Sequence, residues 1–418
     1  MNIEIINIGD ELLIGQVVNT NASWMAEQLN LSGFRVYQFT IISDSRQHIL
    51  DALTEAENRA EVVLISGGIG PTKDDITKHT LCEYFNTRLV FNQEAYRDVE
   101  ALFARRGYPV TELNQQQAEL PENCTGIPNK LGTARGMWFE KDRPGGGKTY
   151  FASMPGVPFE MKAMMTDYII PLLKKSFNAP FIYHKTILTQ GVGESFLAAR
   201  IESWENALPS NVKLAYLPQP GIVRLRLSGE GFDEEVLHRQ IDAEVLKLQS
   251  LIPDYIFGYD DETLEMIVGR ILKEKQCTLA TAESCTGGVI AHMITSVPGS
   301  SVYFKGSVVA YANEIKENIL GVSTESLEKY GAVSKQVVTE MAISIKAKFD
   351  VDYAIATSGI AGPDGGTQEK PVGTIWIAIA TPNEVLANQY LFGDSRERNI
   401  RRTALQALNM LRKKLMMH

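Results

Sequence analysis

The stretch TAESCTGG, residues 281–288, places hydroxyl and thiol side chains where an expected strand gives way to an expected helix. A serine at such a break, here Ser284, lies beside the helix dipole and the free N–H groups of the first turn. That position suits phosphate binding, or a nucleophile with an oxyanion hole beside it. The residues leave a second interpretation open, in which Ser284 or Thr286 only caps the helix.

A serine nucleophile needs a base, and the sequence offers a lysine in place of the usual histidine. His292 lies inside the expected helix, His418 is the last residue, and the pattern GxSxG is absent. Tyr311 instead ends an expected strand, and Lys316 falls in the first turn of the helix that follows. To act as a base near pH 7, Lys316 must lower its pKa by roughly 3 units, which burial among apolar groups can achieve. The alternative is a surface lysine that opposes a neighbouring glutamate.

Two later loops could complete a binding site with these residues. SGIAGP, residues 358–363, follows an expected strand and offers backbone N–H groups that no side chain obstructs. SRER, residues 395–398, opens the last helix, where an arginine can hold a phosphate in bidentate fashion. A solvated basic helix face is the alternative for this second loop.

A second group of chemically active residues lies near the N-terminus, in segments that follow expected strands. These are GDELLIG (9–15) with Asn19 shortly after it, SGGIGPTKDD (66–75) and MPGVPFE (154–160). Glycines allow backbone N–H groups to approach a phosphate, and carboxylates are hard oxygen ligands for the divalent cation that would neutralise it. The alternative is that the acids cap helices and the glycines form tight turns. The predicted substrate-binding residues are Asn19, Gly67, Gly68, Gly70 and Thr72, and the predicted metal ligands are Asp10, Glu11, Asp74 and Asp75.

The elements that must position these segments follow an α/β pattern. Strand and helix signals alternate over residues 1–170, with strands expected at Ile3–Ile8, Phe34–Ile41 and Glu61–Ser66. Such alternation predicts a parallel sheet covered by helices, with binding loops at the carboxyl ends of the strands. Residues 185–250 indicate a small α+β module of order β-α-β-β-α, and the α/β alternation resumes from Asp261. We predict domains at residues 1–172, 173–253 and 254–418.

The composition limits the class of protein. The 418 residues carry a net charge of −9, which argues against a protein that coats nucleic acid or an anionic membrane. Four cysteines without a CxxC pair argue against a disulfide framework or a structural zinc site. No apolar run reaches the roughly 18 residues that a membrane-spanning helix needs. We therefore expect a soluble, cytoplasmic, multi-domain protein without a membrane partner.

The run TAESCTGG, followed by VVAYANEIK and ATSGIAGPDGG, resembles the nicotinamide-nucleotide amidase domain of the CinA family. The resemblance implies that an α/β C-terminal domain hydrolyses the carboxamide of nicotinamide mononucleotide (NMN) to nicotinate mononucleotide and ammonia, without a metal. Ser284 would be the nucleophile, with Tyr311 and Lys316 as activating partners and Arg398 on the 5′-phosphate. Cys285 is the one rival nucleophile, and the resemblance favours Ser284. The other residues predicted to bind this substrate are Thr286, Gly287, Gly288, Ser358 and Gly359.

The N-terminal motifs are similar to the MoaB/MogA-like molybdopterin-binding fold as it occurs in CinA proteins, and the middle module resembles their KH-type domain. The resemblance implies an ADP-ribose pyrophosphatase that releases AMP and ribose 5-phosphate with a divalent metal, cobalt or magnesium, assisted by potassium. It also implies a homodimer. The acidity of the chain and the lack of clustered Lys or Arg in its GVGES turn, residues 191–195, argue against RNA binding by the module. Two alternatives remain, a non-catalytic scaffold for DNA uptake and a molybdopterin-handling enzyme.

Overall fold

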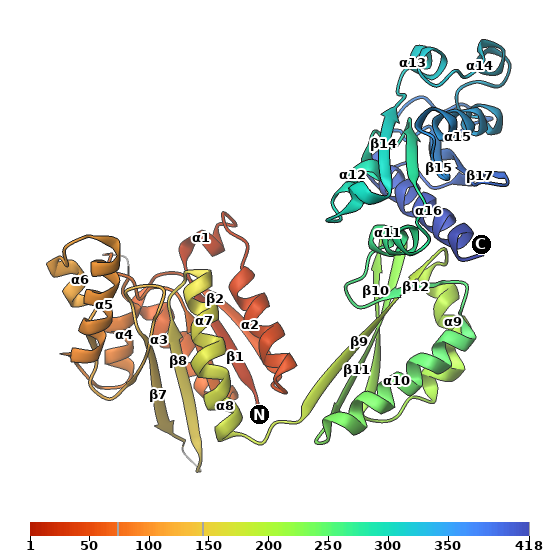
Figure 1. The fold of residues 1–418 in the computed structure, drawn as a ribbon. Helices are drawn as coiled ribbons and strands as arrows, with labels where there is room; N and C mark the ends of the chain where they lie inside the picture. The colour runs from red at the N-terminus through yellow and green to blue at the C-terminus, as the bar shows by residue number, and fades with distance from the viewer. Residues whose placement is uncertain (73–74, 144–145, 418) are drawn as a thin grey trace. The chain divides into compact units, whose positions relative to one another are not determined.

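A computed structural model describes residues 1–72, 75–143 and 146–417 (Figure 1). The chain divides into two compact units, residues 1–183 with 230–237 and residues 184–229 with 238–418. The N-terminal α/β domain lies in the first unit. Most of the middle module and the whole C-terminal domain lie in the second. The predicted fold class, α/β domains on either side of a small α+β module, is confirmed.

A six-stranded sheet forms the centre of the N-terminal domain. Its strands are β1 (Ile3–Ile8), β2 (Val36–Ile42), β3 (Val62–Ser66), β6 (Thr125–Ile127), β7 (Gly136–Asp142) and β8 (Lys148–Met154). The order is β2-β1-β3-β8-β7-β6, with β2, β1, β3 and β8 parallel. The sheet predicted as parallel is therefore mostly parallel, since β7 runs antiparallel to both of its neighbours. A separate two-stranded sheet pairs β4 (Leu89–Phe91) with β5 (Glu119–Pro121).

Helices cover both faces of this sheet. They are α1 (Asp10–Leu13), α2 (Thr20–Leu31), α3 (Arg46–Arg59), α4 (Thr77–Tyr84), α5 (Gln93–Arg106), α6 (Glu112–Gln116), α7 (Pro158–Met164) and α8 (Ile170–Ser176), with a π-helical turn at Met165–Ile169. Apolar side chains of α2, α7 and α8 pack on one face of β1 and β3, and those of α3 and α4 pack on the other. Every residue of β1 is consequently buried, including Glu4. Its carboxylate accepts hydrogen bonds from Arg59 Nε and Nη2 at 2.7 and 2.9 Å, which compensate the buried charge.

The middle module has the predicted order β-α-β-β-α with one further strand. Its elements are β9 (Phe181–Gln190), α9 (Glu194–Asn206), β10 (Val212–Gln219), β11 (Ile222–Gly231), α10 (Glu234–Leu251) and β12 (Ile256–Tyr259). The sheet order is β10-β11-β9-β12. Because β12 pairs antiparallel with β9, the sheet of this module extends past residue 253.

A five-stranded sheet forms the centre of the C-terminal domain. The strands are β13 (Leu279–Glu283), β14 (Phe304–Val309), β15 (Tyr353–Gly359), β16 (Thr374–Ala380) and β17 (Val385–Leu391). The order is β14-β13-β15-β16-β17, with the first three strands parallel and the last two joined by antiparallel pairing. The helices are α11 (Leu264–Glu274), α12 (Val289–Thr295), α13 (Asn313–Asn318), α14 (Thr324–Tyr330), α15 (Lys335–Phe349) and α16 (Arg396–Met417), with a 3₁₀ turn at Ser300–Val302.

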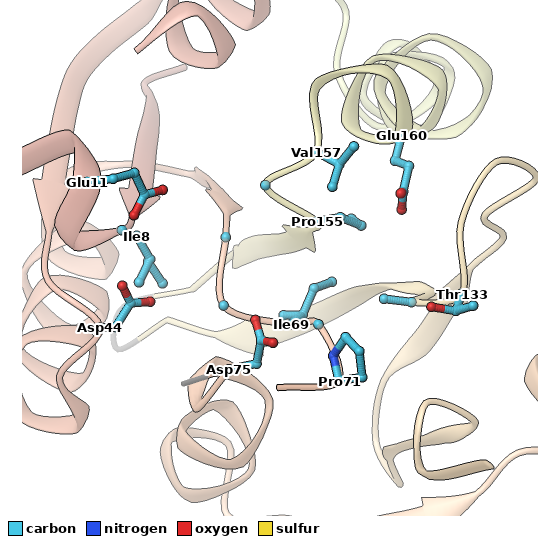
Figure 2. A pocket seen from close by; sticks show the side chains of 16 residues that line it. Ile8, Glu11, Asp44, Ile69, Pro71, Asp75, Thr133, Pro155, Val157 and Glu160 are labelled. Atoms are coloured by element: carbon cyan, nitrogen blue, oxygen red, sulfur yellow. The ribbon is translucent and has the colours of Figure 1, made fainter. Parts of the chain in front are cut away.

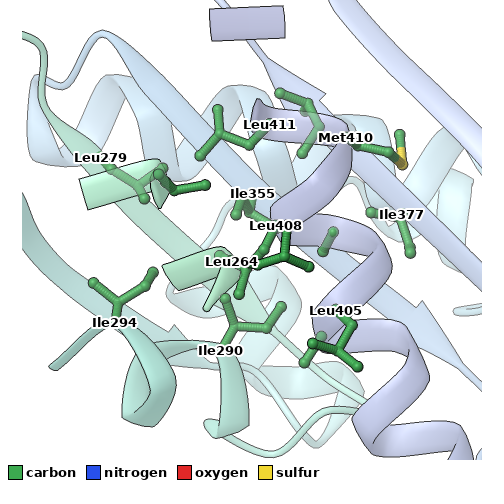
Figure 3. Packing of buried hydrophobic residues seen from close by; sticks show 14 of the residues in the cluster. Leu264, Leu279, Ile290, Ile294, Ile355, Ile377, Leu405, Leu408, Met410 and Leu411 are labelled. Atoms are coloured by element: carbon green, nitrogen blue, oxygen red, sulfur yellow. The ribbon is translucent and has the colours of Figure 1, made fainter. Parts of the chain in front are cut away.

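Two hydrophobic clusters fix the carboxyl ends of β13, β14 and β15. On one face, Leu264 of α11, Ile290 of α12 and Leu408 of α16 meet Ile355 and Ile377 of the sheet (Figure 3). On the other face, α15 packs against the small alanine side chains of β13 and β15. Burial of this apolar area is the main favourable term in folding, and it sets the strand ends in a rigid frame.

Candidate active sites

The first candidate site is a pocket of about 390 Å³ in the N-terminal domain (Figure 2). It lies at the carboxyl ends of β1, β3 and β8, which contribute Gly9, Gly67 and Pro155, and Asp44 joins them from the chain that follows β2. Open α/β sheets place their binding loops at this edge. The predicted convergence of the three N-terminal segments is therefore present in the fold.

Glycines of the 66–75 loop form one wall of this pocket, and Gly67, Gly68 and Gly70 all line it. A Cβ atom on Gly67 would lie 2.2 Å from the Ile8 carbonyl oxygen, and one on Gly68 would lie 2.1 Å from Thr77 Oγ1. Both residues have positive φ, +120° and +67°, a conformation that other residues rarely adopt. The wall is therefore bare backbone, which suits the close approach of a phosphate.

Carboxylates surround the same pocket, and Figure 2 shows Glu11, Asp44, Asp75 and Glu160 around it. Burial, followed by repulsion from Asp10, Glu11 and Asp75, raises the pKa of Asp44, although the Asp10 N–H donates to Asp44 Oδ2 at 3.1 Å. Like charges that share a pocket lower one another's tendency to ionise. A cation in the pocket would relieve this repulsion.

The predicted metal ligands fit an oxygen-preferring cation in kind. Glu11 and Asp75 line the pocket, Asp10 does not line it, and Asp74 lies outside the described residues. Asp75 Oδ2 accepts hydrogen bonds from the N–H and hydroxyl of Thr72 at 2.8 and 2.6 Å, so Thr72 contacts the lining residue Asp75 without lining the pocket itself. Across residues 1–72, 75–143 and 146–417, no three acidic, histidine or cysteine side chains lie close enough to hold a metal ion.

Asp44 and Glu160 are pocket residues that the sequence analysis left without a role. Asp44 follows β2, so the strand-end rule that selected the other segments could have found it. Glu160 Oε2 accepts from Asn129 Nδ2 at 2.6 Å, a contact that no local pattern indicates. Asn19 has a local role, because its Oδ1 caps α2 by accepting the Ala22 N–H at 3.1 Å.

The second candidate site lies where β13 ends, and the carboxylate of Glu283 organises it. Glu283 is 0% exposed. Its Oε2 accepts the N–H groups of Gly288 and Ile290 at 3.0 and 3.1 Å, and its Oε1 accepts that of Ala291 at 2.8 Å. The first turn of α12 is therefore capped from the preceding strand. The sequence analysis passed over this residue.

Ser284 follows directly and is 8% exposed, and its N–H donates to the Thr357 carbonyl at 3.0 Å. The helix-cap interpretation of Ser284 and Thr286 is wrong, because Glu283 takes the free N–H groups of α12 and the Thr286 hydroxyl pairs with that of Thr357 at 2.8 Å. For the same reason, the first N–H groups of α12 do not form the expected oxyanion hole. The Thr286 N–H has no partner among the described residues and can still donate to an oxyanion.

Burial distinguishes the rival nucleophile from Ser284. It raises the pKa of the Cys285 thiol to about 12. The thiolate is the reactive form of cysteine, so this environment disfavours a thiol mechanism.

Lys316 is 1% exposed, so the surface-lysine interpretation is wrong. Its Nζ donates to the carbonyl oxygens of Ala310 and Tyr311 at 2.8 and 3.3 Å, and no carboxylate in the described ranges pairs with it. Burial lowers the pKa of Lys316. The Ala310 N–H in turn donates to the Glu283 carbonyl at 2.8 Å. Ala310 therefore connects the lysine amine to the strand end that precedes Ser284.

The Tyr311 side chain pairs with Arg396 of α16, a contact that the sequence analysis did not predict. The Tyr311 side chain is exposed, and its hydroxyl accepts from Arg396 Nη2 at 2.8 Å. Arg396 Nη1 also donates to the Gly362 carbonyl at 2.8 Å. The structure thus brings the Tyr311 carbonyl, and not its hydroxyl, to Lys316. Arg398 is exposed and has no partner within the described residues, so its guanidinium is available to a ligand.

The remaining predicted residues shape the backbone of this site. Ser358 is buried, and its hydroxyl donates to the Ala332 carbonyl at 2.6 Å. A Cβ atom on Gly359 would lie 2.3 Å from a side-chain atom of β16, so the close packing of these strands needs glycine. Gly287 and Gly288 both have positive φ, +60° and +96°, which the turn into α12 requires.

Comparisons with known proteins identify the family. Three family models match the chain: a probable molybdopterin binding domain over residues 4–175, the damage-inducible protein CinA KH domain over 184–258 and the CinA C-terminal domain over 261–415. The CinA-like protein of Flavobacterium psychrophilum is 50% identical over 420 residues, covering 100% of this chain and 99% of that protein. This chain belongs to the CinA family. The predicted resemblance, including the MoaB/MogA-like and KH-type domains, is confirmed.

Further relatives of the CinA chain include the CinA-like protein of Cytophaga hutchinsonii, 48% identical over 412 residues that cover 99% of this chain and 97% of that protein. A crystal structure of a CinA superfamily protein from Klebsiella pneumoniae is 34% identical, covers 37% of this chain and 97% of that one, and has a TM-score of 0.36. Throughout the described ranges, no helix of the CinA chain combines the length and apolarity that crossing a membrane requires.

The geometry of Glu283 generates a test of its role. Glu283→Gln should lower the free energy of unfolding by about 2–4 kcal/mol, because bonds between a carboxylate and backbone N–H groups are worth about 1.5–3 kcal/mol each. Urea unfolding measures the loss, and amide hydrogen exchange at Ile290 and Ala291 should become faster. Glu314→Gln, at an exposed position of α13, is the matched control and should change neither measurement. Equal behaviour of the two variants would contradict the capping role.

Proposed function

We propose that this CinA protein is a bifunctional hydrolase of pyridine nucleotides whose C-terminal domain deamidates NMN. The buried amine of Lys316 is the observation that carries the proposal. A neutral lysine amine has two N–H groups and one lone pair, and the carbonyls of Ala310 and Tyr311 accept both N–H groups. The lone pair is left to accept a proton, and burial without a carboxylate partner favours this neutral form.

In the proposed reaction, Ser284 Oγ attacks the carboxamide carbon of NMN while its proton passes to Lys316. The Thr286 N–H donates to the resulting oxyanion. As the C–N bond breaks, Lys316 returns the proton to the nitrogen, which leaves as ammonia. Water then attacks the Ser284 ester with Lys316 again as base, and nicotinate mononucleotide is released. Tyr311 would assist in activating Ser284, and its exposed hydroxyl accepts a hydrogen bond from Arg396.

Two adjacent substitutions test the nucleophile. Ser284→Ala should abolish ammonia release from NMN, whereas Cys285→Ser should retain much of it, because the Cys285 thiol is held in its protonated form. Ammonia release by the purified variants is the measurement. An inactive Cys285→Ser variant beside an active Ser284→Ala variant would establish a thiol mechanism instead.

The base has its own signature in the pH dependence. Because only neutral Lys316 accepts a proton, kcat should fall along one limb as the pH drops below the lysine pKa. Since burial lowers this pKa, the limb should lie at lower pH than for an ordinary lysine. Lys316→Met should remove both the activity and the limb. A pH profile without an acid limb in the wild type would exclude Lys316 as the base.

Arg398 is tested through the phosphate of the substrate. Arg398→Ala should raise KM for NMN about ten- to a hundredfold and leave kcat nearly unchanged, because a charge-assisted bond of about 1.5–3 kcal/mol to the remote phosphate is lost. Nicotinamide riboside, which lacks the phosphate, should not distinguish this variant from the wild type. An unchanged KM for NMN would remove Arg398 from the site.

We propose that the N-terminal domain hydrolyses ADP-ribose to AMP and ribose 5-phosphate by adding water across the pyrophosphate. The bare backbone at Gly67 and Gly68 would face the phosphates, and the carboxylates of Glu11, Asp44 and Asp75 would attract a divalent cation that the phosphates help to bind. When bound, that ion would neutralise phosphate charge and acidify a water molecule. The mutual repulsion of these carboxylates supports this assignment.

Chelation separates the two activities. EDTA should abolish ADP-ribose hydrolysis and leave NMN deamidation intact, and Asp44→Asn should reproduce the effect of the chelator. Asp51→Asn, on the exposed side of α3, is the control and should behave as the wild type. Loss of both activities on chelation would show that the metal has been assigned to the wrong chemistry. A protein inactive on both substrates would favour the alternative of a non-catalytic scaffold for DNA uptake. Turnover of molybdopterin precursors would favour the alternative of a molybdopterin-handling enzyme.

A further inference from the structure

A second large pocket, of about 520 Å³, lies within the unit that contains the middle module and the C-terminal domain. The turn between β9 and α9, the hairpin of β10 and β11, and helix α16 enclose it. Gln190 joins the two sides, because its Nε2 donates to Gln406 Oε1 at 2.9 Å and its Oε1 accepts from Asn409 Nδ2. None of the residues assigned above to either reaction lines this pocket.

Positive charge predominates around this pocket. Arg402 and Lys413 of α16 line it, against the single carboxylate of Glu194. Arg412 does not line the pocket but donates from Nε to the lining residue Asn409, at Oδ1, over 2.9 Å; it is 6% exposed, and in the described ranges no carboxylate pairs with it. Burial of an unpaired cation is costly, and an anion in the pocket would offset the cost.

Directed N–H donors accompany this charge. In the described chain, the backbone N–H groups of Gly191, Val192 and Gly193 have no hydrogen-bond acceptor, and they precede the first turn of α9. Arg402 is held in place, since its Nη1 donates to the Phe392 carbonyl at 3.0 Å and its guanidinium lies 4.7 Å from the Phe392 ring centroid. Its Nε and Nη2 have no partner in the described residues. Free backbone amides beside a fixed guanidinium form an arrangement that recognises phosphate.

We propose that this pocket binds a small phosphate monoester, with the phosphate between Arg402, Lys413 and the 191–193 amides. A free phosphate ion would leave most of the volume empty, since ligand pockets of about 300–1,000 Å³ enclose whole metabolites. Tyr390 and Pro218 offer apolar surface to the organic group of the ester. The bound ester would contact both the middle module and α16 of the C-terminal domain.

The test is calorimetric titration of the full-length protein with ribose 5-phosphate and AMP, with inorganic phosphate, ribose and adenosine as arms that lack one half of the ligand. Arg402→Gln and Lys413→Gln should each weaken binding of the two esters by about tenfold or more, as expected for loss of a charge-assisted bond. Glu194→Gln should strengthen it, because the opposing carboxylate is removed. Ribose and adenosine should bind too weakly to detect, and inorganic phosphate more weakly than either ester.

Lys348→Gln, at an exposed position of α15 outside this pocket, is the matched control and should leave the affinities unchanged. Glu194 and Lys413 are exposed, so their variants report on binding even if Arg402→Gln fails to fold. Ester binding that none of the three pocket variants alters would place the ligand elsewhere and overturn the proposal. Equal effects of Lys348→Gln and Lys413→Gln would overturn it as well, because they would indicate general charge attraction.

Discussion

The buried carboxylate of Glu283 is the interaction on which the C-terminal site depends. A charge with 0% exposure is tolerated only where hydrogen bonds compensate it, and here the backbone of the next helix supplies them. The turn between β13 and α12 cannot open without leaving that charge unpaired, so Ser284 is held in one position. The same hydrogen bonds place the negative charge of Glu283 at the positive end of the α12 dipole, so that end is no longer available to a ligand. The buried amine next to this turn comes instead from Lys316 of α13.

The N-terminal pocket uses the opposite arrangement. Its carboxylates lie at the carboxyl ends of neighbouring strands and in part repel one another, as the raised pKa of Asp44 indicates. The glycines of the 66–75 loop add backbone without side chains. A polar site that leaves like charges uncompensated retains electrostatic energy for a ligand of opposite charge. In the C-terminal site, backbone N–H groups of the protein compensate the buried carboxylate. In the N-terminal pocket, the carboxylates repel one another, which favours binding of a cation.

Two buried basic residues of the second unit, Lys316 and Arg412, can be compared directly. Among the described residues Lys316 has no acidic partner, and two carbonyl oxygens accept from it, which favours a neutral amine. Arg412 has no acidic partner in the described part of the chain either, but a guanidinium does not deprotonate in proteins, so its charge persists near the pocket beside Asn409. The two residues differ in consequence because their intrinsic pKa values differ. Burial therefore favours the neutral form of the lysine, whereas the arginine stays a source of positive potential.

The sequence by itself determined the alternation of strands and helices, the strand-end positions of the glycine loops, and the places of Ser284 and Lys316 in segments that follow strands. These are local properties, visible as periodicity, turn residues and spacing. Only the tertiary structure decided which groups meet. The Tyr311 hydroxyl reaches Arg396, 85 residues later, and Glu283 becomes a helix cap only once α12 packs back on β13. Such contacts depend on the order of strands in the sheet and on the packing of helices over it, and no local pattern of residue types encodes either.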